Sequence, residues 1–286
     1  MIRLATREDQ DAILALCARD PWNGTEVMTA CLSLCADHRN VDWRYCDIWI
    51  GASESQLHAP QYLLCRIGGS YRMVGAPHSP ARREELQQFL SLQLPGKLIA
   101  RSEDLEEFAA CCPGQELSAP APQMLCCSRL GLCGEEDSRI QSCQSLWSLY
   151  EVLADADEAF RDISQDELTA RLRFLQRGGA QFFELREQGR VVSVGGILMP
   201  EPSEYGLIVD LCTRRESRGK GYAARMVDRL CSEAFLQGKI PALLCGSRSL
   251  AAYYERMGFE QEGSWRSLCL ETAQQLPQEE KENLDQ

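Results

Sequence analysis

The sequence lacks any hydrophobic run long enough to cross a membrane. A spanning helix needs about 18 consecutive apolar residues, and the 286 residues contain no such stretch. Residues 1–9 also lack the apolar segment of a secretory signal. Basic residues are in deficit, since 30 Lys and Arg stand against 42 Asp and Glu, for a net charge of −12. This balance argues against general binding to nucleic acid or to an anionic membrane.

Histidine is scarce and cysteine abundant. The 3 histidines lie in the first third, and the 15 cysteines form no C-x-x-C pair, so the usual zinc-site spacings are absent. An odd cysteine count without a signal does not fit a secreted disulfide framework. We therefore expect reduced, mostly structural thiols in a cytoplasmic protein, with no metal. The alternative is a cysteine-only metal site within residues 111–143, where the cysteines are Cys111, Cys112, Cys126, Cys127, Cys133 and Cys143.

Hydrophobic periodicity divides the chain into two α/β halves of similar order, each with two helices followed by a strand, a turn and a strand. In the first half, the pattern predicts a helix after a capping box at Thr6–Asp9, strands at 45–50, 62–67 and 71–74, and helices at 25–36, 81–92 and 102–111. In the second half, it predicts strands at 182–185, 190–194, 205–213, 242–245 and 259–270, and helices at 138–153, 164–177 and 250–257. It also predicts a strong helix after the glycine-bearing loop, with an apolar face from Ala223 to Ala234.

The segment 112–122 is the best linker candidate, because Pro113, Pro120 and Pro122 interrupt regular structure there. We therefore expect an N-terminal domain at 1–120, a second domain at 121–273, and an acidic tail at 274–286. Chemistry is expected in the second domain. The corresponding turn of the first half, at residues 75–78, contains a proline that removes an amide donor.

The most informative stretch is residues 209–224, where a strand leads into a turn with Gly219 and Gly221 and an amphipathic helix starts at once. Free backbone N–H groups and the helix dipole at such a turn favour an anion. Residues 214–225 carry five basic side chains and one acidic side chain, in a chain of opposite net charge. The pattern predicts a phosphate-binding loop.

Three known kinds of phosphate-binding loop have patterns that can be tested against residues 209–224. The P-loop pattern G-x-x-x-x-G-K-[ST] is absent. A dinucleotide pattern is present as Gly219-x-Gly221-x-x-Ala224, but the acidic residue expected about 20 positions later is missing, because no Asp or Glu lies between Glu233 and Glu255. An NAD-linked enzyme is therefore only a distant alternative.

The third loop fits better. Arg218-x-x-Gly221-x-Ala223 resembles the R/Q-x-x-G-x-G/A signature of the GNAT superfamily of N-acetyltransferases, whose loop holds the pyrophosphate of acetyl-CoA. The segment 254–259 is similar to the Y-E-K-L-G-F segment of that family. The resemblance covers residues 124–272, and residues 1–110 resemble a second, degenerate GNAT half. It implies two tandem α/β (α+β) modules, each a mixed, mostly antiparallel sheet flanked by helices.

The resemblance also implies roles for individual residues. Tyr254 matches the general acid, and Glu204 and Asp210 are candidates for the base, with Glu204 slightly preferred and water the alternative. Ser247 stands where the family often has Asn. The residues implied to bind acetyl-CoA are Leu211, Cys212, Thr213, Arg218, Gly219, Lys220, Gly221, Tyr222, Ala223, Ala224 and Ser247.

The resemblance thus predicts an acetyl-CoA-dependent N-acetyltransferase that acts on a primary amine of a small molecule or peptide by direct attack. Acetyl-CoA is the co-substrate, and no metal is required. An acetyl-CoA-binding sensor or scaffold without turnover is the alternative. The acceptor, the acyl chain length and the oligomeric state are left open by the sequence.

Overall fold

The computed structural model describes residues 1–36, 46–52, 59–93, 96–110, 116–127, 137–161 and 163–270. The first half contains β1 (Ile2–Leu4), η1 (Arg7–Asp9), α1 (Gln10–Cys17), α2 (Asn23–Ala36), β2 (Cys46–Gly51), β3 (Tyr62–Ile67), β4 (Ser70–Val74), α3 (Pro80–Ser91), β5 (Gly96–Arg101), α4 (Ser102–Ala109) and β6 (Ala121–Leu125). The second half contains β7 (Ile140–Ser142), α5 (Leu146–Ala156), η2 (Glu158–Phe160), α6 (Gln165–Arg177), β8 (Ala180–Glu187), β9 (Arg190–Leu198), β10 (Tyr205–Thr213), η3 (Arg215–Ser217), α7 (Tyr222–Leu236), β11 (Ile240–Leu244), α8 (Arg248–Glu255) and β12 (Glu260–Leu270).

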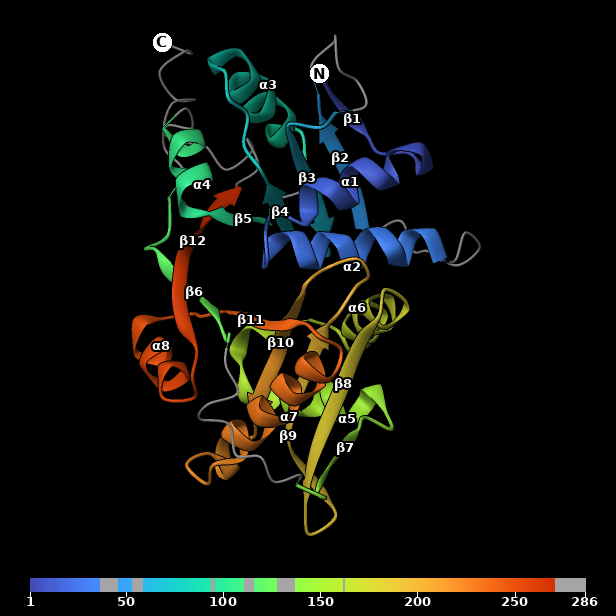
Figure 1. The fold of residues 1–286 in the computed structure, drawn as a ribbon, viewed down its shortest axis with the longest axis vertical. Coiled ribbons are helices and arrows are strands. Elements are labelled where there is room, and N and C mark those ends of the chain that lie inside the picture. Colours follow the sequence, from blue (N-terminus) through green and yellow to red (C-terminus); the bar gives the residue numbers. More distant parts are fainter. Residues whose placement is uncertain are drawn as a thin grey trace, which may run out of the picture.

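All these strands belong to one sheet with the order β1-β2-β3-β4-β5-β12-β6-β11-β10-β9-β8-β7. Strands β1–β6 correspond in sequence order to β7–β12, so that β1 matches β7 and β6 matches β12. With this correspondence, the strand order is the same when the sheet is read from either edge. The two parallel pairs, β4–β5 and β10–β11, occupy matching positions. The chain is therefore a duplicated fold with approximate two-fold symmetry, and its two modules are stacked along the long axis (Figure 1).

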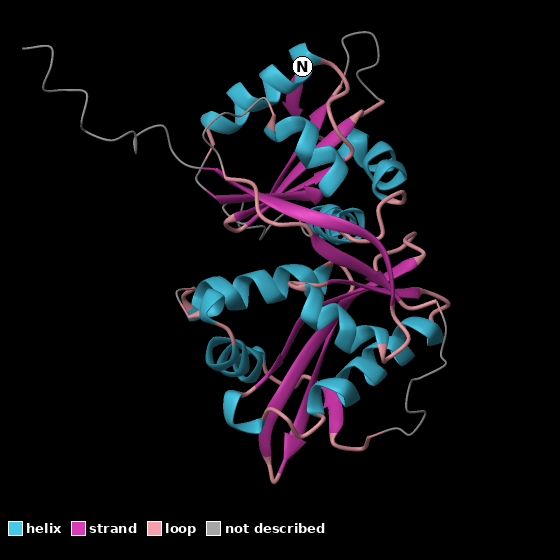
Figure 2. Cartoon of the chain, turned by 90° about the vertical axis from the view of Figure 1, so that its left-hand side faces the viewer, coloured by secondary structure: helices cyan, strands magenta, loops and turns pink. Residues whose placement is uncertain are grey.

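The last strand of each module is exchanged with the other module. β12 lies next to β5 through six antiparallel pairs, from Trp265↔Arg101 to Leu270↔Gly96. β6 lies between β12 and β11, and both of these pairings are antiparallel. Figure 2 shows strands running through the waist between the two lobes. The exchange covers edges that each module would otherwise expose.

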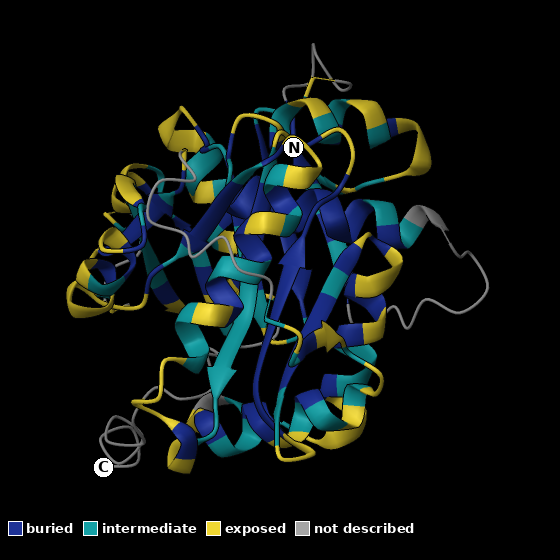
Figure 3. Cartoon of the chain, turned by 60° about the horizontal axis from the view of Figure 1, so that its bottom comes forward, coloured by how far each residue is buried: buried dark blue, intermediate teal, exposed yellow. Residues whose placement is uncertain are grey.

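Three groups of buried apolar side chains form the core. The first joins the modules, because it contains residues of α1, α2, α5 and α6 together with strands of both halves. The second lies under α7 and α8, and the third lies under α3 and α4 and includes Leu268 of β12. Exposed residues are concentrated on the outer faces of the helices and in the loops, whereas the central strands are buried (Figure 3).

Helix α2 lies across the middle of the molecule, between the two modules (Figure 1). Its Ser33 hydroxyl donates to the carbonyl of Phe174 on α6 at 2.8 Å. A Cβ added at Gly178, which follows α6, would lie 2.2 Å from the carbonyl oxygen of Thr29 on α2, so this close approach requires glycine. Just before α2, the Trp22 indole donates to Met124 of β6 at 3.3 Å.

The predicted elements agree with the structure in most places, and the tandem fold class is confirmed. The helix predicted over 138–153 is wrong at its start, because Ile140–Ser142 form β7 and α5 begins only after Ser145. The predicted linker overlaps β6 at residues 121–122. The sequence analysis also missed β1 and β5. The predicted tail at 274–286 lies outside the described residues.

We predict that a cavity in β12 destabilises both modules together. Leu268 is fully buried, so Leu268→Ala should lower the free energy of unfolding by about 2–5 kcal/mol. Because β12 packs in the core of the first module, circular dichroism and tryptophan fluorescence should report one shared shift in urea. Cys269→Ala is the control, because Cys269 is exposed on the same strand. Two separate transitions, with only the second module weakened, would contradict the exchange.

Candidate active site

Strands β10 and β11 separate part-way along their length. They pair in parallel from Tyr205↔Ile240 to Ile208↔Leu243. Beyond that point β10 continues to Thr213 alongside β9, while the end of β11 pairs with β6 at Leu244↔Gln123. The segment 209–213 thus has no strand neighbour on its β11 side among the described residues. The separation begins at residue 209.

A β-bulge shapes the separated part of β10. The register with β9 shifts between Val209 and Cys212, and Asp210 within the bulge has φ 52°. This left-handed conformation is tolerated by Asp better than by most residues. Bulges redirect side chains, and here the Asp210 carboxylate accepts a hydrogen bond from Arg171 Nη1 of α6 at 2.7 Å. Only 5% of the Asp210 side chain is exposed, so this is a buried ion pair.

A cavity of about 370 Å³ opens where the strands separate. Part of its lining is apolar, with side chains from β10, β11 and α8, and Tyr254 also lines the cavity. Another part of the lining is ionic and consists of Asp210, Arg171, Glu26 and Arg72. Glu26 and Arg72 come from the first module, so both modules form the walls of this cavity.

Tyr254 is held firmly within α8. Its ring packs edge-on against Phe259 and Tyr253, with centroids 5.6 and 5.3 Å away, and the residue is 8% exposed. Burial raises the pKa of its phenol above the ordinary value, so the hydroxyl is protonated at neutral pH. No described group forms a hydrogen bond with this hydroxyl. A positioned, protonated phenol therefore lines the cavity with its proton available.

The loop before α7 leaves its backbone open. Gly219 and Gly221 have φ 76° and 80°, and a Cβ added at either would meet no atom within 4 Å. Among the described residues, no carbonyl accepts the N–H groups of residues 219–224. The first turn of a helix leaves such donors unpaired and suits an anion. The turn thus leaves backbone N–H groups open where the sequence predicts a phosphate-binding loop.

The charge of this loop is smaller than the sequence suggests. Arg218 donates through Nη2 to the carbonyl of Ala156 at 2.6 Å and through Nε to that of Thr213 at 3.3 Å. Arg214, Arg215 and Arg225 bind carboxylates of other segments. Within the described residues, Lys220 is the one basic side chain of this loop without a partner. Arg218 ties the loop to α5, which the motif alone did not reveal.

Apart from Ser247, the other residues predicted to bind acetyl-CoA are distributed over β10 and the start of α7. Cys212 and Thr213 continue β10, and their pairing with Ser193 fixes the strand, since the Ser193 hydroxyl donates to the Cys212 carbonyl at 2.9 Å. Burial, together with the charges of Asp210 and Asp157, raises the pKa of the Cys212 thiol to about 12. Tyr222 donates to Glu187 at 3.2 Å, and Ala223 and Ala224 begin α7. Leu211 lines the cavity.

Glu204 and Ser247 lie away from the cavity lining. Glu204 is exposed just before β10, six residues from Asp210, which corresponds to about 20 Å along a strand. It is not among the residues around Tyr254. Ser247 is the N-cap of α8, and its hydroxyl accepts from the Leu250 N–H at 3.2 Å. The structure thus brings Asp210 and Tyr254 to one cavity but not Glu204.

The strands β4 and β5 of the first module also separate, but only over the two residues Met73 and Val74, which continue alongside β3. β4 pairs with β5 through Arg72 and ends at Val74, so it is shorter than β10. The following turn contains Pro77, and Pro80 is the first residue of α3. The two prolines cannot donate a backbone N–H. In the described part of the first module, the free strand segment is therefore short, and the turn after it is less open, because a Cβ at Gly75 would lie 2.7 Å from the carbonyl oxygen of Gln61.

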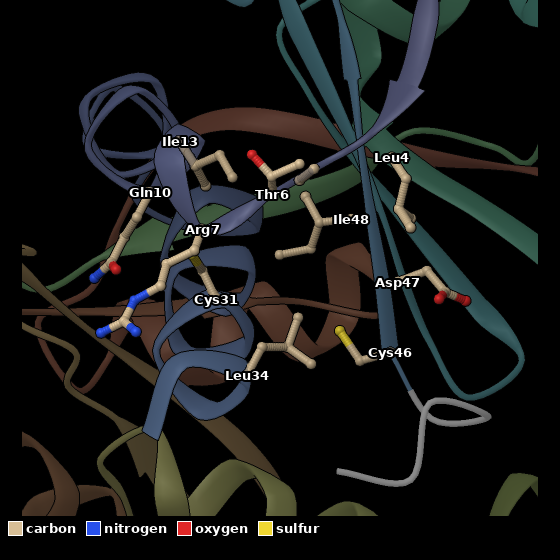
Figure 4. A pocket seen from close by; sticks show the side chains of 11 residues that line it. Leu4, Thr6, Arg7, Gln10, Ile13, Cys31, Leu34, Cys46, Asp47 and Ile48 are labelled. Carbon is tan, nitrogen blue, oxygen red and sulfur yellow. The ribbon is translucent and has the colours of Figure 1, made fainter. Parts of the chain in front are cut away.

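A different cavity, of about 300 Å³, lies in the first module between α1, α2 and the start of β2. Ile13, Leu34 and Ile48 point toward one another across it, whereas Arg7 extends away (Figure 4). Asp47, on its edge, is paired with Arg66. This cavity has no counterpart of Tyr254, so we assign it no chemistry.

The cysteines do not form a described metal centre. Cys126 is buried, Cys127 is exposed and Cys143 is half-buried, and all are free thiols. Cys111, Cys112 and Cys133 lie outside the described residues. Among the residues that the structure covers, no group of three or more His, Cys, Asp or Glu side chains could hold a metal ion.

None of the described helices has the length and apolar character of a membrane span.

Comparison with known families addresses the second module directly. Residues 145–259 match the model of the acetyltransferase (GNAT) family. The chain thus contains a GNAT acetyltransferase domain at residues 145–259. The match includes β10, the glycine loop, α7 and Tyr254. No curated protein matches the chain in sequence.

Solved structures extend the likeness to the first module. A tandem GNAT protein from the clavulanic acid biosynthesis pathway is 12% identical with a TM-score of 0.57, over 94% of this chain and 98% of that one. A Drosophila protein has 11% identity and a TM-score of 0.59 over the same shares. A GCN5-related N-acetyltransferase from Sphaerobacter thermophilus has 14% identity and a TM-score of 0.56, over 94% of each chain. At these identities the likeness shows the fold alone.

The capping geometry of Ser247 generates a prediction. Ser247→Ala removes the acceptor of the Leu250 N–H and should lower the free energy of unfolding by about 0.5–2 kcal/mol, as for other N-caps. Ser247→Asp keeps an acceptor at this position and should retain most of that stability. Urea unfolding of the two variants measures the difference. Equal midpoints for Ser247→Ala and the parent would contradict the capping role.

Proposed function

We propose that the chain is an acetyl-CoA-dependent N-acetyltransferase whose second module carries the reaction. The observation that carries this proposal is the common placement of three features on β10, α7 and α8. These are a strand segment without a neighbour on one side, the open glycine turn that follows this strand, and a protonated tyrosine that lines the same cavity as the strand segment. The GNAT family of this module supports acyl transfer.

Acetyl-CoA would be held by main-chain groups more than by side chains. The free N–H groups of residues 219–224 suit its pyrophosphate, with Lys220 nearby as the unpartnered cation. The unpaired side of residues 209–213 suits the amide-bearing pantetheine arm, because strand backbone can pair with it as a neighbouring strand would. Main-chain recognition explains why Leu211, Cys212 and Thr213 need only fit. Ser247 contributes by holding α8, which carries Tyr254.

The reaction is a direct attack by an amine on the thioester. The amine, having lost its ammonium proton, forms the new C–N bond while the C–S bond breaks. The departing thiolate takes a proton from Tyr254, and the amide nitrogen loses the second amine proton to solvent, which also restores the phenol. Asp210 is the carboxylate that lies in the cavity, so of the two predicted bases it is the one we retain, with water as the relay.

The remaining assignments complete the proposal. Along the sequence, we assign residues 1–120 to a GNAT-like N-terminal domain without its own catalytic loop. We assign residues 121–273, which begin with the exchanged strand β6, to the catalytic domain, followed by an acidic tail. The proposed acceptor is a small molecule or peptide amine in the cytoplasm, with no nucleic acid or membrane partner. An acetyl-CoA-binding sensor without turnover is the competing function. Release of free thiol in the presence of amines distinguishes the two.

Acetyl-CoA should raise the melting temperature, whereas NAD and ATP should not. A ligand that binds only the folded state stabilises it by about 2.7 kcal/mol at a hundredfold excess over Kd. Gly221→Asp should abolish the shift, because it places a carboxylate at the anion site and a side chain at φ 80°. Gly238→Asp is the control, since Gly238 also has φ 70° but lies after α7. An unchanged acetyl-CoA shift in Gly221→Asp would remove the loop from the site.

Tyr254→Phe separates catalysis from binding. The variant keeps the ring and its packing, so the acetyl-CoA thermal shift and KM should change little. Loss of the proton donor should lower kcat by about 10²–10⁴-fold, as measured by thiol release. Tyr253→Phe removes the neighbouring phenol, which does not line the cavity, and should stay near the parent. A decrease below about threefold would leave water as the acid.

A further inference from the structure

The cavity beside Tyr254 adjoins a second cavity that reaches into the first module. A second cavity of about 270 Å³ is lined by Gly68, Gly69 and Ser70 of the β3–β4 turn. It shares four lining residues with the cavity beside Tyr254, namely Glu26, Arg72, Phe160 and Arg171. These residues therefore stand between Tyr254 and the turn of the first module. An acceptor that approaches Tyr254 from this side must pass them.

Two ion pairs, each with a buried carboxylate and a partly buried guanidinium group, form this passage. The Arg72 guanidinium donates from Nε to Glu26 Oε2 at 2.6 Å and from Nη2 to Oε1 at 3.4 Å. The exposed fractions of the Glu26 and Arg72 side chains are 7% and 14%. Asp210 and Arg171 form the second pair, from the second module. Buried pairs are costly to desolvate and give little net stability, so their presence along a cavity indicates use by a charged ligand.

Arg72 has a donor to spare. Its Nη1 is buried and has no hydrogen-bond partner within the described part of the chain. Buried donors without a partner are rare, because each one forfeits its hydration. A carboxylate that enters beside Arg72 could satisfy this donor after a small side-chain movement, and guanidinium groups bind carboxylates with favourable geometry. The nearby carboxylates of Glu26 and Asp210 suit an ammonium group.

We propose that the acceptor is a small amino acid, and that Arg72 of the first module binds its carboxylate while its amino group faces Asp210 and Tyr254. This inference rests on the proposed function and names its substrate class. The first module, which lacks a catalytic loop, then supplies acceptor recognition. An amine without a carboxylate, including a polyamine, would offer Arg72 Nη1 no such acceptor.

The test compares amino acids with their α-amides as acceptors, by release of thiol from acetyl-CoA. Glycine with glycinamide and L-alanine with L-alaninamide differ only in the carboxylate. The amine of an α-amide is less basic than that of the amino acid, so near neutral pH a larger fraction of it is unprotonated and able to attack. The protonation state of the amine therefore does not produce a preference for the acid. We expect kcat/KM to be about 10- to 100-fold higher for the acids, the range for a hydrogen bond to a charged group. An equal or higher value for the amides would overturn the inference.

Variants of Arg72 test whether this residue causes the preference for amino acids over their amides. Arg72→Met should abolish it while the acetyl-CoA thermal shift stays, and Arg72→Lys, which keeps the charge without the planar fork, should reduce it. Arg66→Met is the matched control, because Arg66 on the neighbouring strand β3 donates to Asp47 at 3.0 Å and lines neither cavity. A preference that survives in both Arg72 variants would overturn the assignment.

The proposed function and this inference fail differently. Thiol release with amides and simple amines at the rate of amino acids would leave the N-acetyltransferase in place and overturn the amino-acid acceptor. No release with any acceptor, alongside a normal acetyl-CoA thermal shift, would overturn both, in favour of a binding protein. If Arg72→Met shows no thermal shift and is therefore misfolded, the Arg72→Lys result decides, because a parent-like preference there counts against Arg72.

Discussion

The pairing of β12 with β5 and β6 is the constraint on which the rest of the structure depends. It makes one sheet out of two modules and places each module's last strand inside the other half. The hydrogen-bonded ladder and the buried face of Leu268 hold this arrangement. Neither module can then rotate freely against the other, as linked domains with a small interface often do. The contact between α2 and α6 is fixed as a consequence.

This rigidity explains how a site can be shared between modules. Glu26 lies on α2 and Arg72 on β4, while Tyr254 and Asp210 lie on α8 and β10. Catalytic and binding groups must be held to within a fraction of an ångström to act together. A flexible linker could not provide that precision, but a continuous sheet and a shared core can. The duplicated module without a glycine turn therefore has a physical use as a wall of the site.

Local patterns predicted the parts of the fold that depend on local physics. The helix at 25–36, the neighbouring strands at 182–185 and 190–194 and the glycine loop at 219–221 follow from periodicity and from conformations that glycine allows. The strand exchange could not be predicted, because β6 is short and follows prolines, and nothing in its sequence names β12 as its neighbour. β7 was mistaken for helix because three residues carry too little periodicity to distinguish the two.

The candidate site was predicted unevenly for the same reason. The turn and Tyr254 stand in contiguous motifs, whereas the carboxylates that neutralise Arg214 and Arg215 lie about 60 residues away on α5 and η2. Glu26 and Arg72 were missed entirely. A signal existed, since Glu26 is the only charged residue of α2 and Arg72 the only one of β4. A single charge within an apolar element requires a partner or a function.

The central claim is that acetyl-CoA occupies the separated strand and glycine turn of the second module. Amide hydrogen exchange with and without acetyl-CoA tests this claim most directly, because the groups proposed to bind are backbone N–H groups. The account predicts slower exchange at residues 209–213 and 219–224, with little change at the corresponding first-module turn at residues 75–79. Protection of the first-module turn, or no protection at 219–224 at saturating acetyl-CoA, would contradict it.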